Sequence, residues 1–160
     1  MKIKGLKKVD KIVNNFTQKN FGVTAKLDNE FEAFCSKKVI GYTLFCDEDE
    51  KAYFIMDAQA KYPHINADIF LWCLMHEIGH CLTDDMWNEN EQKYFYIQKK
   101  NMTNIEDDRL RNDWYHACPD EFFATKWAGD YMTAHPRKIA KFWNKMQMAI
   151  INLYKKNNLI

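Results

Sequence analysis

The sequence predicts an α+β fold, in which a small antiparallel sheet packs on a buried helix and further helices follow in the chain. Residues 21–57 are rich in β-branched and aromatic residues, which favour strands. From residue 66 onward, apolar residues recur at three- and four-residue spacing instead, which favours helices. The 160 residues, 1–160, are expected to form a single domain whose core needs no disulfide bonds.

Each predicted element follows from its local pattern. A first amphipathic helix covers residues 9–19, because apolar residues stand at positions 9, 12, 13 and 16. Four strands are then predicted at residues 23–27, 31–35, 38–46 and 51–57, with the acidic run 47–50 as the turn between the last two. Later helices are predicted at residues 88–99, 120–133 and 136–155, and the polar stretch 101–113 is predicted to be a loop. Pro136 suits the first turn of the last helix.

The central helix is predicted over residues 66–82, NADIFLWCLMHEIGHCL. Two apolar stripes cover almost its whole circumference, so it is expected to be buried. Asn66 is the expected N-cap, and Asp68 in the first turn suits the positive end of the helix dipole. Gly79 costs about 1 kcal/mol relative to alanine in a helix interior, so its presence indicates that another backbone packs closely against it.

The same helix carries His76-Glu77-Ile78-Gly79-His80, the most informative motif of the chain. His76 and His80 lie one turn apart on one face, so both imidazoles can bind one metal ion. Glu77 points to the neighbouring side, where it can hold a water molecule and act as a general base. This spacing, H-E-x-x-H, is typical of a hydrolytic zinc site, and core packing alone has no reason to prefer it.

A catalytic zinc ion usually has three protein ligands, so a third must come from elsewhere in the chain. A third histidine at position 86, after a glycine at position 83, is excluded because Met86 and Thr83 stand there. Glu121 is the first candidate, since it opens a predicted helix whose small residues allow close packing on the central helix. The alternatives are Asp120, His116, Asp84 and Asp85.

His76-Glu77-x-x-His80 together with Glu121-x-x-Ala124 resembles the gluzincin branch of the zincin metallopeptidases. The compact layout is similar to small intracellular members such as the ImmA/IrrE-type and phage-encoded peptidases. The resemblance covers about twenty residues in two motifs, together with the preceding hairpin. It implies a zincin-like fold, a Zn2+ ion bound by the two histidines and Glu121, and hydrolysis of peptide bonds.

Three further expectations accompany this resemblance. Many gluzincins have an aspartate four residues after the ligand glutamate, and this chain departs from that pattern with Thr125. The strand 52–57 is expected to edge the cleft and to pair with an extended peptide substrate; the alternative is an inner strand with both edges paired. Each histidine also needs a partner for its other ring nitrogen, for which Asp84, Asp85 and Asp120 are the candidates.

In the predicted reaction, zinc polarises the scissile carbonyl, and Glu77 moves a proton from the attacking water to the leaving amine. Four residues are suited to donate a hydrogen bond to the oxyanion: Tyr115, His116, Tyr131 and His135. Glu77, Tyr131 and His116 are the predicted catalytic residues. The predicted function is that of a hydrolase, a zinc metallopeptidase with a protein or peptide substrate. The alternatives are a zinc-stabilised binding or regulatory protein without turnover and an interaction domain in which the motif is accidental.

The composition of the chain indicates which classes of partner and which cellular compartment to expect. The net charge of +1 argues against nucleic acid as the main partner, although the first twenty residues and the segment after residue 137 are rich in lysine. Five cysteines without a C-x-x-C pair indicate reduced thiols. Because there is no apolar run of membrane-spanning length and no signal-peptide core, we expect a cytoplasmic protein without membrane contact.

Overall fold

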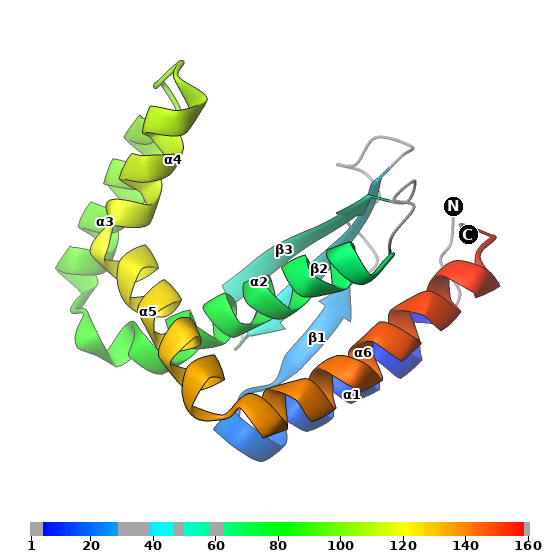
Figure 1. Ribbon diagram of the computed structural model, residues 1–160. Helices are drawn as coiled ribbons and strands as arrows, with labels where there is room; N and C mark the ends of the chain where they lie inside the picture. Colours follow the sequence, from blue (N-terminus) through cyan, green and yellow to red (C-terminus); the bar gives the residue numbers. More distant parts are fainter. Residues whose placement is uncertain (1–4, 29–38, 47–49, 58–62, 159–160) are drawn as a thin grey trace.

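Six α-helices and a three-stranded sheet make up the described part of the protein (Figure 1). In the computed structural model, the described residues are 5–28, 39–46, 50–57 and 63–158. The helices are α1 (Leu6–Phe21), α2 (Pro63–Thr83), α3 (Glu89–Met102), α4 (Asp108–Ala117), α5 (Pro119–Ala134) and α6 (Pro136–Lys156). The strands are β1 (Ala25–Asp28), β2 (Val39–Cys46) and β3 (Glu50–Asp57), and a short 3-10 helix, η2 (Asp84–Met86), follows α2.

The sheet is antiparallel, with the strand order β1-β2-β3. Ala25 of β1 pairs with Cys46 of β2, and Val39 of β2 pairs with Asp57 of β3. β3 is therefore the last strand of the described sheet, and it also contacts α2. The strand predicted at 31–35 and residues 47–49 of the predicted turn lie outside the described residues.

The predicted α+β fold class is wrong, because the protein is built mainly from helices, although the small antiparallel sheet beside α2 is present. Among the side chains whose burial is described (residues 5–25 and 71–158, with a few gaps), the core consists largely of residues from α1, α2, α5 and α6, and Ala25 of β1 joins them. These four helices have 16 or 21 residues each, whereas the strands have 4, 8 and 8. Packing of helix on helix therefore sets the architecture, and the small sheet is added beside α2 (Figure 1).

Part of the core lies where α6 packs against α1 and α2. Met75 and Ile78 of α2 and Ile150 of α6 are at most 1% exposed. Phe16 of α1 stacks on Phe142 of α6, with ring centroids 3.9 Å apart. α1 and α6 lie side by side along this apolar interface (Figure 1).

α2 differs from its prediction in two respects. It begins at Pro63, so Asn66 lies inside its first turn and is not the N-cap. Its circumference is not fully covered, because Trp72 and Leu82 are 44% and 42% exposed. The prediction of an almost fully buried helix is therefore wrong: one side of α2 faces the core and another faces solvent.

Local capping explains where the later helices begin. Asn88 accepts a hydrogen bond from the N–H of Glu91 at 3.0 Å, and the Glu91 carboxylate accepts one from the N–H of Asn88 at 2.9 Å, a capping box that starts α3. The predicted loop 101–113 instead contains the start of α4, where Asp107 accepts a hydrogen bond from the N–H of Leu110 at 2.9 Å. The sequence of α4, DRLRNDWYHA, is mostly polar, as is typical of a loop, and none of its residues is fully buried. Pro136 begins α6, which confirms its predicted position.

None of the described helices combines the length and the apolar character that a membrane span requires.

Candidate metal centre

The candidate site is built beside the crossing of α2 and α5. Gly79 of α2 approaches the backbone of Ala124 of α5 so closely that a Cβ at Gly79 would lie 2.5 Å from the Ala124 carbonyl oxygen. Ala124 is fully buried, and Thr83 donates a hydrogen bond to the Gly79 carbonyl at 2.8 Å. The prediction that another backbone packs against Gly79 is confirmed, and its missing side chain sets the distance between the two helices.

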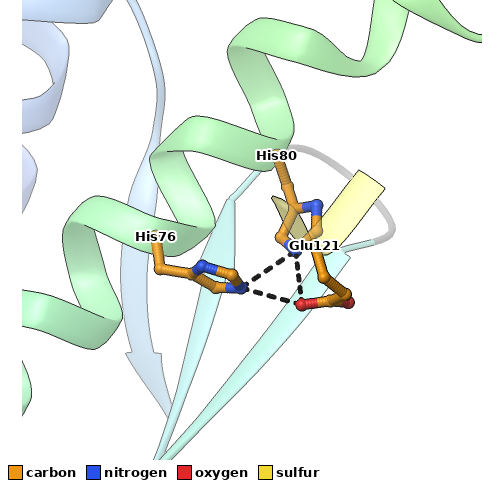
Figure 2. A group of neighbouring side chains, drawn as sticks. All are labelled: His76, His80 and Glu121. Atoms are coloured by element: carbon orange, nitrogen blue, oxygen red, sulfur yellow. Dashed lines mark hydrogen bonds and ion pairs between the residues drawn. The ribbon is translucent and has the colours of Figure 1, made fainter. Parts of the chain in front are cut away.

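Three atoms that could bind one metal ion converge beside this crossing (Figure 2). We call the residues that supply them, His76, His80 and Glu121, the donor group. His76 and His80 project from α2, and Glu121 projects from the first turn of α5. The Nε2 atoms of the two histidines are 3.1 Å apart. Oε2 of Glu121 lies 3.0 Å from Nε2 of His76 and 3.4 Å from Nε2 of His80. The structure thus brings together the two histidines and the carboxylate that the sequence ranked first, and Glu121 is 2% exposed.

The spacing of these three atoms fits a metal ion better than it fits hydrogen bonds alone. Ligands bound at about 2.0–2.1 Å in a tetrahedron lie roughly 3.3–3.4 Å from one another, and the observed separations run from 3.0 to 3.4 Å. Each Nε2 atom either donates one hydrogen or accepts one, so three mutual contacts cannot all be hydrogen bonds. Lone pairs on all three atoms can, however, point at a single cation.

The other predicted ligands are not part of this group. His116, Asp84 and Asp85 are exposed, and Asp120 forms an ion pair with a lysine instead. Among the described residues, the group that could hold a metal ion consists of His76, His80 and Glu121.

Lys99 of α3 holds the opposite side of Glu121, a contact that the sequence did not reveal. Its Nζ lies 2.9 Å from Oε1 of Glu121 and 2.5 Å from Oδ2 of Asp120. Burial by itself would raise the pKa of Glu121, but hydrogen bonds from the two histidines and Lys99 outweigh it, so this pKa lies well below its usual range. No local pattern indicates the contact, because Lys99 and Glu121 are 22 positions apart.

Thr125 orients the first histidine. Its Oγ1 lies 3.1 Å from Nδ1 of His76, which directs Nε2 of the same ring toward Glu121. Asp84 accepts a hydrogen bond from a glutamine, and Asp120 binds a lysine. For His76, therefore, the orienting group is Thr125 and not one of the predicted carboxylates.

Glu77 lies next to the three donor atoms and is half-buried. Burial raises its pKa, the positive charge of a protonated His80 or His76 would lower it, and the negative charge of Glu121 raises it again. The net effect is a raised pKa, which makes the carboxylate a stronger base than an exposed glutamate. Glu77 is not in the donor group itself, as expected for a base rather than a ligand.

The predicted oxyanion donors fall into two sets. Tyr115 of α4 lies close to the site: burial raises the pKa of its phenol, and the negative charge of Glu121 raises it further. Tyr131 lies ten residues beyond Glu121 on α5, roughly 15 Å along the helix axis, and stacks on Trp127. His116 is exposed and contacts the ring of Tyr115.

His135, the remaining candidate donor, lies just beyond the end of α5. Its ring stacks on Tyr131, with the centroids 4.2 Å apart, and its Nδ1 lies 3.0 Å from the Tyr131 carbonyl oxygen. Of the four candidates, the structure therefore places Tyr115 next to the site, the exposed His116 against the Tyr115 ring, and Tyr131 and His135 along α5 away from the site.

A cavity of about 180 Å3 borders the donor group. His80 and Thr83 of α2, Phe95 and Lys99 of α3 and Asp120 of α5 contribute to its lining. The site therefore opens on one side to a space enclosed by three helices.

No protein-family model, no curated protein and no solved structure matches this chain.

Proposed function

We propose that the protein is a zinc-dependent metallopeptidase of the gluzincin type. One observation supports this most directly: His76 Nε2, His80 Nε2 and Glu121 Oε2 lie within 3.4 Å of one another, with the Glu77 carboxyl group beside them. A site that served stability alone would have no use for a base next to its ligands.

Zinc suits this donor set, because catalytic zinc sites combine two or three imidazoles or carboxylates and keep one position open. His76, His80 and Glu121 would hold the ion. When bound there, zinc would supply Lewis-acid polarisation of a carbonyl group and lower the pKa of a water molecule toward about 7.

The chain's own residues have separate roles in the proposed hydrolysis. Glu77 accepts a proton from the attacking water and passes it to the leaving amine, for which its raised pKa is favourable. Thr125 holds the ring of His76 in position. Lys99 holds Oε1 of Glu121, so that Oε2 stays directed at the histidines.

Tyr115 is the residue that we propose as hydrogen-bond donor to the oxyanion. A phenol is protonated at neutral pH and can donate a hydrogen bond, and the raised pKa of Tyr115 extends that state to higher pH. Its position close to Glu121 favours it over Tyr131, which lies roughly 15 Å further along α5.

The proposed substrate is a protein or peptide in extended conformation. β3 is the last strand of the described sheet and contacts α2, the helix that carries both histidines. A substrate strand could pair with such an edge through main-chain hydrogen bonds. We further propose the cytoplasm as the compartment, since Cys73 and Cys118 are free thiols.

The decisive experiment replaces Glu77 by glutamine and measures zinc content and cleavage of a proteome-derived peptide library. Glu77→Gln is expected to retain one zinc per chain and to lose cleavage by at least about 100-fold, because it removes a base but no ligand. Glu106→Gln makes the same change at an exposed position and should leave both properties unchanged.

Two outcomes would contradict the proposal. A wild-type protein without stoichiometric zinc would end every metal-based function. A wild-type protein that binds zinc but cleaves no more than Glu77→Gln would favour the second candidate, a zinc-stabilised binding or regulatory protein.

A further inference from the structure

A second charged feature lies away from the metal centre, between α1 and α6. A cavity of about 520 Å3 opens there, and five cationic side chains line it: Lys19, Arg137, Lys138, Lys141 and Lys145. No acidic side chain contributes to the lining. We call this feature the basic groove. Its apolar floor includes Phe16 and Phe142, which are buried and stacked on each other.

The charges of the basic groove are exposed and uncompensated. All five cationic residues are exposed, and none of them takes part in the ion pairs found among the described residues. α6 contains no acidic residue along its 21 positions. The net charge of +1 therefore conceals a strong segregation of charge, because the acidic residues lie elsewhere in the chain.

The cations form a row along the first half of α6. Lys138, Lys141 and Lys145 follow one another at three and four residues, which places them on one helix face. Residues 137–145 extend over about 12 Å, roughly the length of three to four nucleotides in a stacked strand. Lys19 faces this row from α1. A row of cations at regular spacing fits a polymer with several anionic groups better than it fits a single anion.

Stacked aromatic rings lie next to the groove. Trp127, Tyr131 and His135 stack in sequence, with centroid separations of 5.2 and 4.2 Å. Lys138, a lining residue of the groove, lies 5.9 Å from the Tyr131 ring centroid and 3.4 Å from its hydroxyl. His135 is exposed at the end of this stack. A row of cations beside an accessible planar ring is the combination that binds single strands through phosphates and bases.

We propose that the basic groove binds single-stranded nucleic acid, with the phosphates along the α6 cations and a base near His135. An acidic protein segment or an anionic membrane would satisfy the charges but would make no use of the stacked rings. A membrane would also need an exposed apolar face, and the apolar floor of this groove is buried. The binding site is independent of the proposed peptidase function.

The test measures fluorescence anisotropy of labelled single-stranded DNA and RNA, about 15 nucleotides long, with the full-length protein. With about four phosphates contacted, Kd is expected to rise roughly 50-fold between 50 and 200 mM salt. The triple variant Lys138→Glu/Lys141→Glu/Lys145→Glu should weaken binding at least about tenfold. His135→Ala should weaken it about fivefold, the loss expected for one stacked base. Glu77→Gln should bind like the wild type.

A matched control makes the same charge change on exposed lysines away from the groove: Lys7→Glu/Lys93→Glu/Lys100→Glu. Equal weakening by both triple variants would overturn the proposal, since net charge alone would then explain binding. Competition by polyglutamate as effective as that by the oligonucleotide would indicate an acidic protein partner and would also overturn it. So would binding to phosphatidylserine vesicles without binding to either oligonucleotide. Circular dichroism of each variant verifies that it is folded.

Discussion

The helix pair α2–α5 buries charged side chains, whereas the helix pair α1–α6 leaves them exposed to solvent. At the crossing of α2 and α5 the charges lie inside: Glu121 is 2% exposed, and its oxygens contact two imidazoles and the Lys99 ammonium. Between α1 and α6 the interface is apolar, with Phe16 stacked on Phe142, and the cations stand outside it. The buried charges between α2 and α5 must lie at defined distances from one another. The exposed charges of α1 and α6 are stabilised by water alone.

The physical reason is the cost of removing a charge from water. A buried carboxylate loses several kcal/mol of hydration, which neighbouring donors must replace in good geometry. An exposed lysine keeps its hydration, so its position is loosely determined and its effect extends as a field. We therefore expect changes at the α2–α5 crossing to have large local effects and changes at the α1–α6 pair to have small effects on stability.

The largest effect on folding is expected for Gly79→Ala. Its Cβ would meet the Ala124 carbonyl oxygen at 2.5 Å, so the two helices must move apart. We expect the free energy of unfolding to fall by about 2–3 kcal/mol, measured by urea denaturation. Gly129→Ala on α5 is the matched control: it has open space around its Cβ and should stabilise the protein by about 0.5–1 kcal/mol. Equal stability of Gly79→Ala and the wild type would refute the close crossing.

Removal of zinc is expected to have a comparable effect. At a free zinc concentration of 100 times Kd, binding adds about 2.7 kcal/mol to the stability of the folded state. For a chain of this size, the melting temperature should therefore fall by about 5–10 °C when a chelator is added. His80→Ala should abolish the difference between the zinc-bound and chelated forms. His116→Ala, which lies outside the donor group, should preserve it. A chelator-sensitive melting temperature in His80→Ala would place the metal elsewhere.

A smaller effect is expected for Thr125→Val. The valine keeps the shape but removes the hydroxyl that contacts Nδ1 of His76. Loss of such an orienting group usually weakens metal binding about 10- to 100-fold, which competition with a chromogenic chelator measures. Thr125→Ser retains the hydroxyl and should stay within about threefold of the wild type. Unchanged zinc affinity in the valine variant would mean that Thr125 does not orient the ring.

The smallest effect on stability is expected for Lys141→Ala in the basic groove. The side chain is exposed and has no ion pair among the described residues, so the free energy of unfolding should change by less than about 0.5 kcal/mol. Thermal or urea denaturation measures it. A loss above about 1 kcal/mol would show that the exposed charges of α1 and α6 also matter for stability, and the contrast with α2 and α5 would fail.

Several features of the site were accessible from local patterns. The spacing of His76 and His80 places both rings on one side of any helix, and Gly79 indicated the close approach that Ala124 makes. Glu121 was ranked first as the third donor, and it is the carboxylate that meets the histidines. Tyr131 lies away from the donor group, and its ten-residue separation from Glu121 on one helix already implied roughly 15 Å along the helix axis.

The balance between sheet and helix was the main error of the sequence-based prediction. Strand-like composition between residues 21 and 57 suggested an α+β fold, but four helices of 16 or 21 residues supply most of the core among the side chains whose burial is described. Propensity describes single segments, whereas the architecture depends on which apolar faces bury most surface against each other. α4 was missed because its ten residues are mostly polar, a composition that is also typical of loops.

The sequence by itself determined the paired imidazoles, because the helical repeat places residues four positions apart on one face. Only the tertiary structure decided which other residues complete the candidate metal site around these imidazoles. Glu121 meets His76 across 45 positions, Thr125 meets it across 49, and Lys99 meets Glu121 across 22. Contacts of that separation depend on how α2, α3 and α5 pack, and the packing follows from the summed burial of many side chains rather than from any one motif.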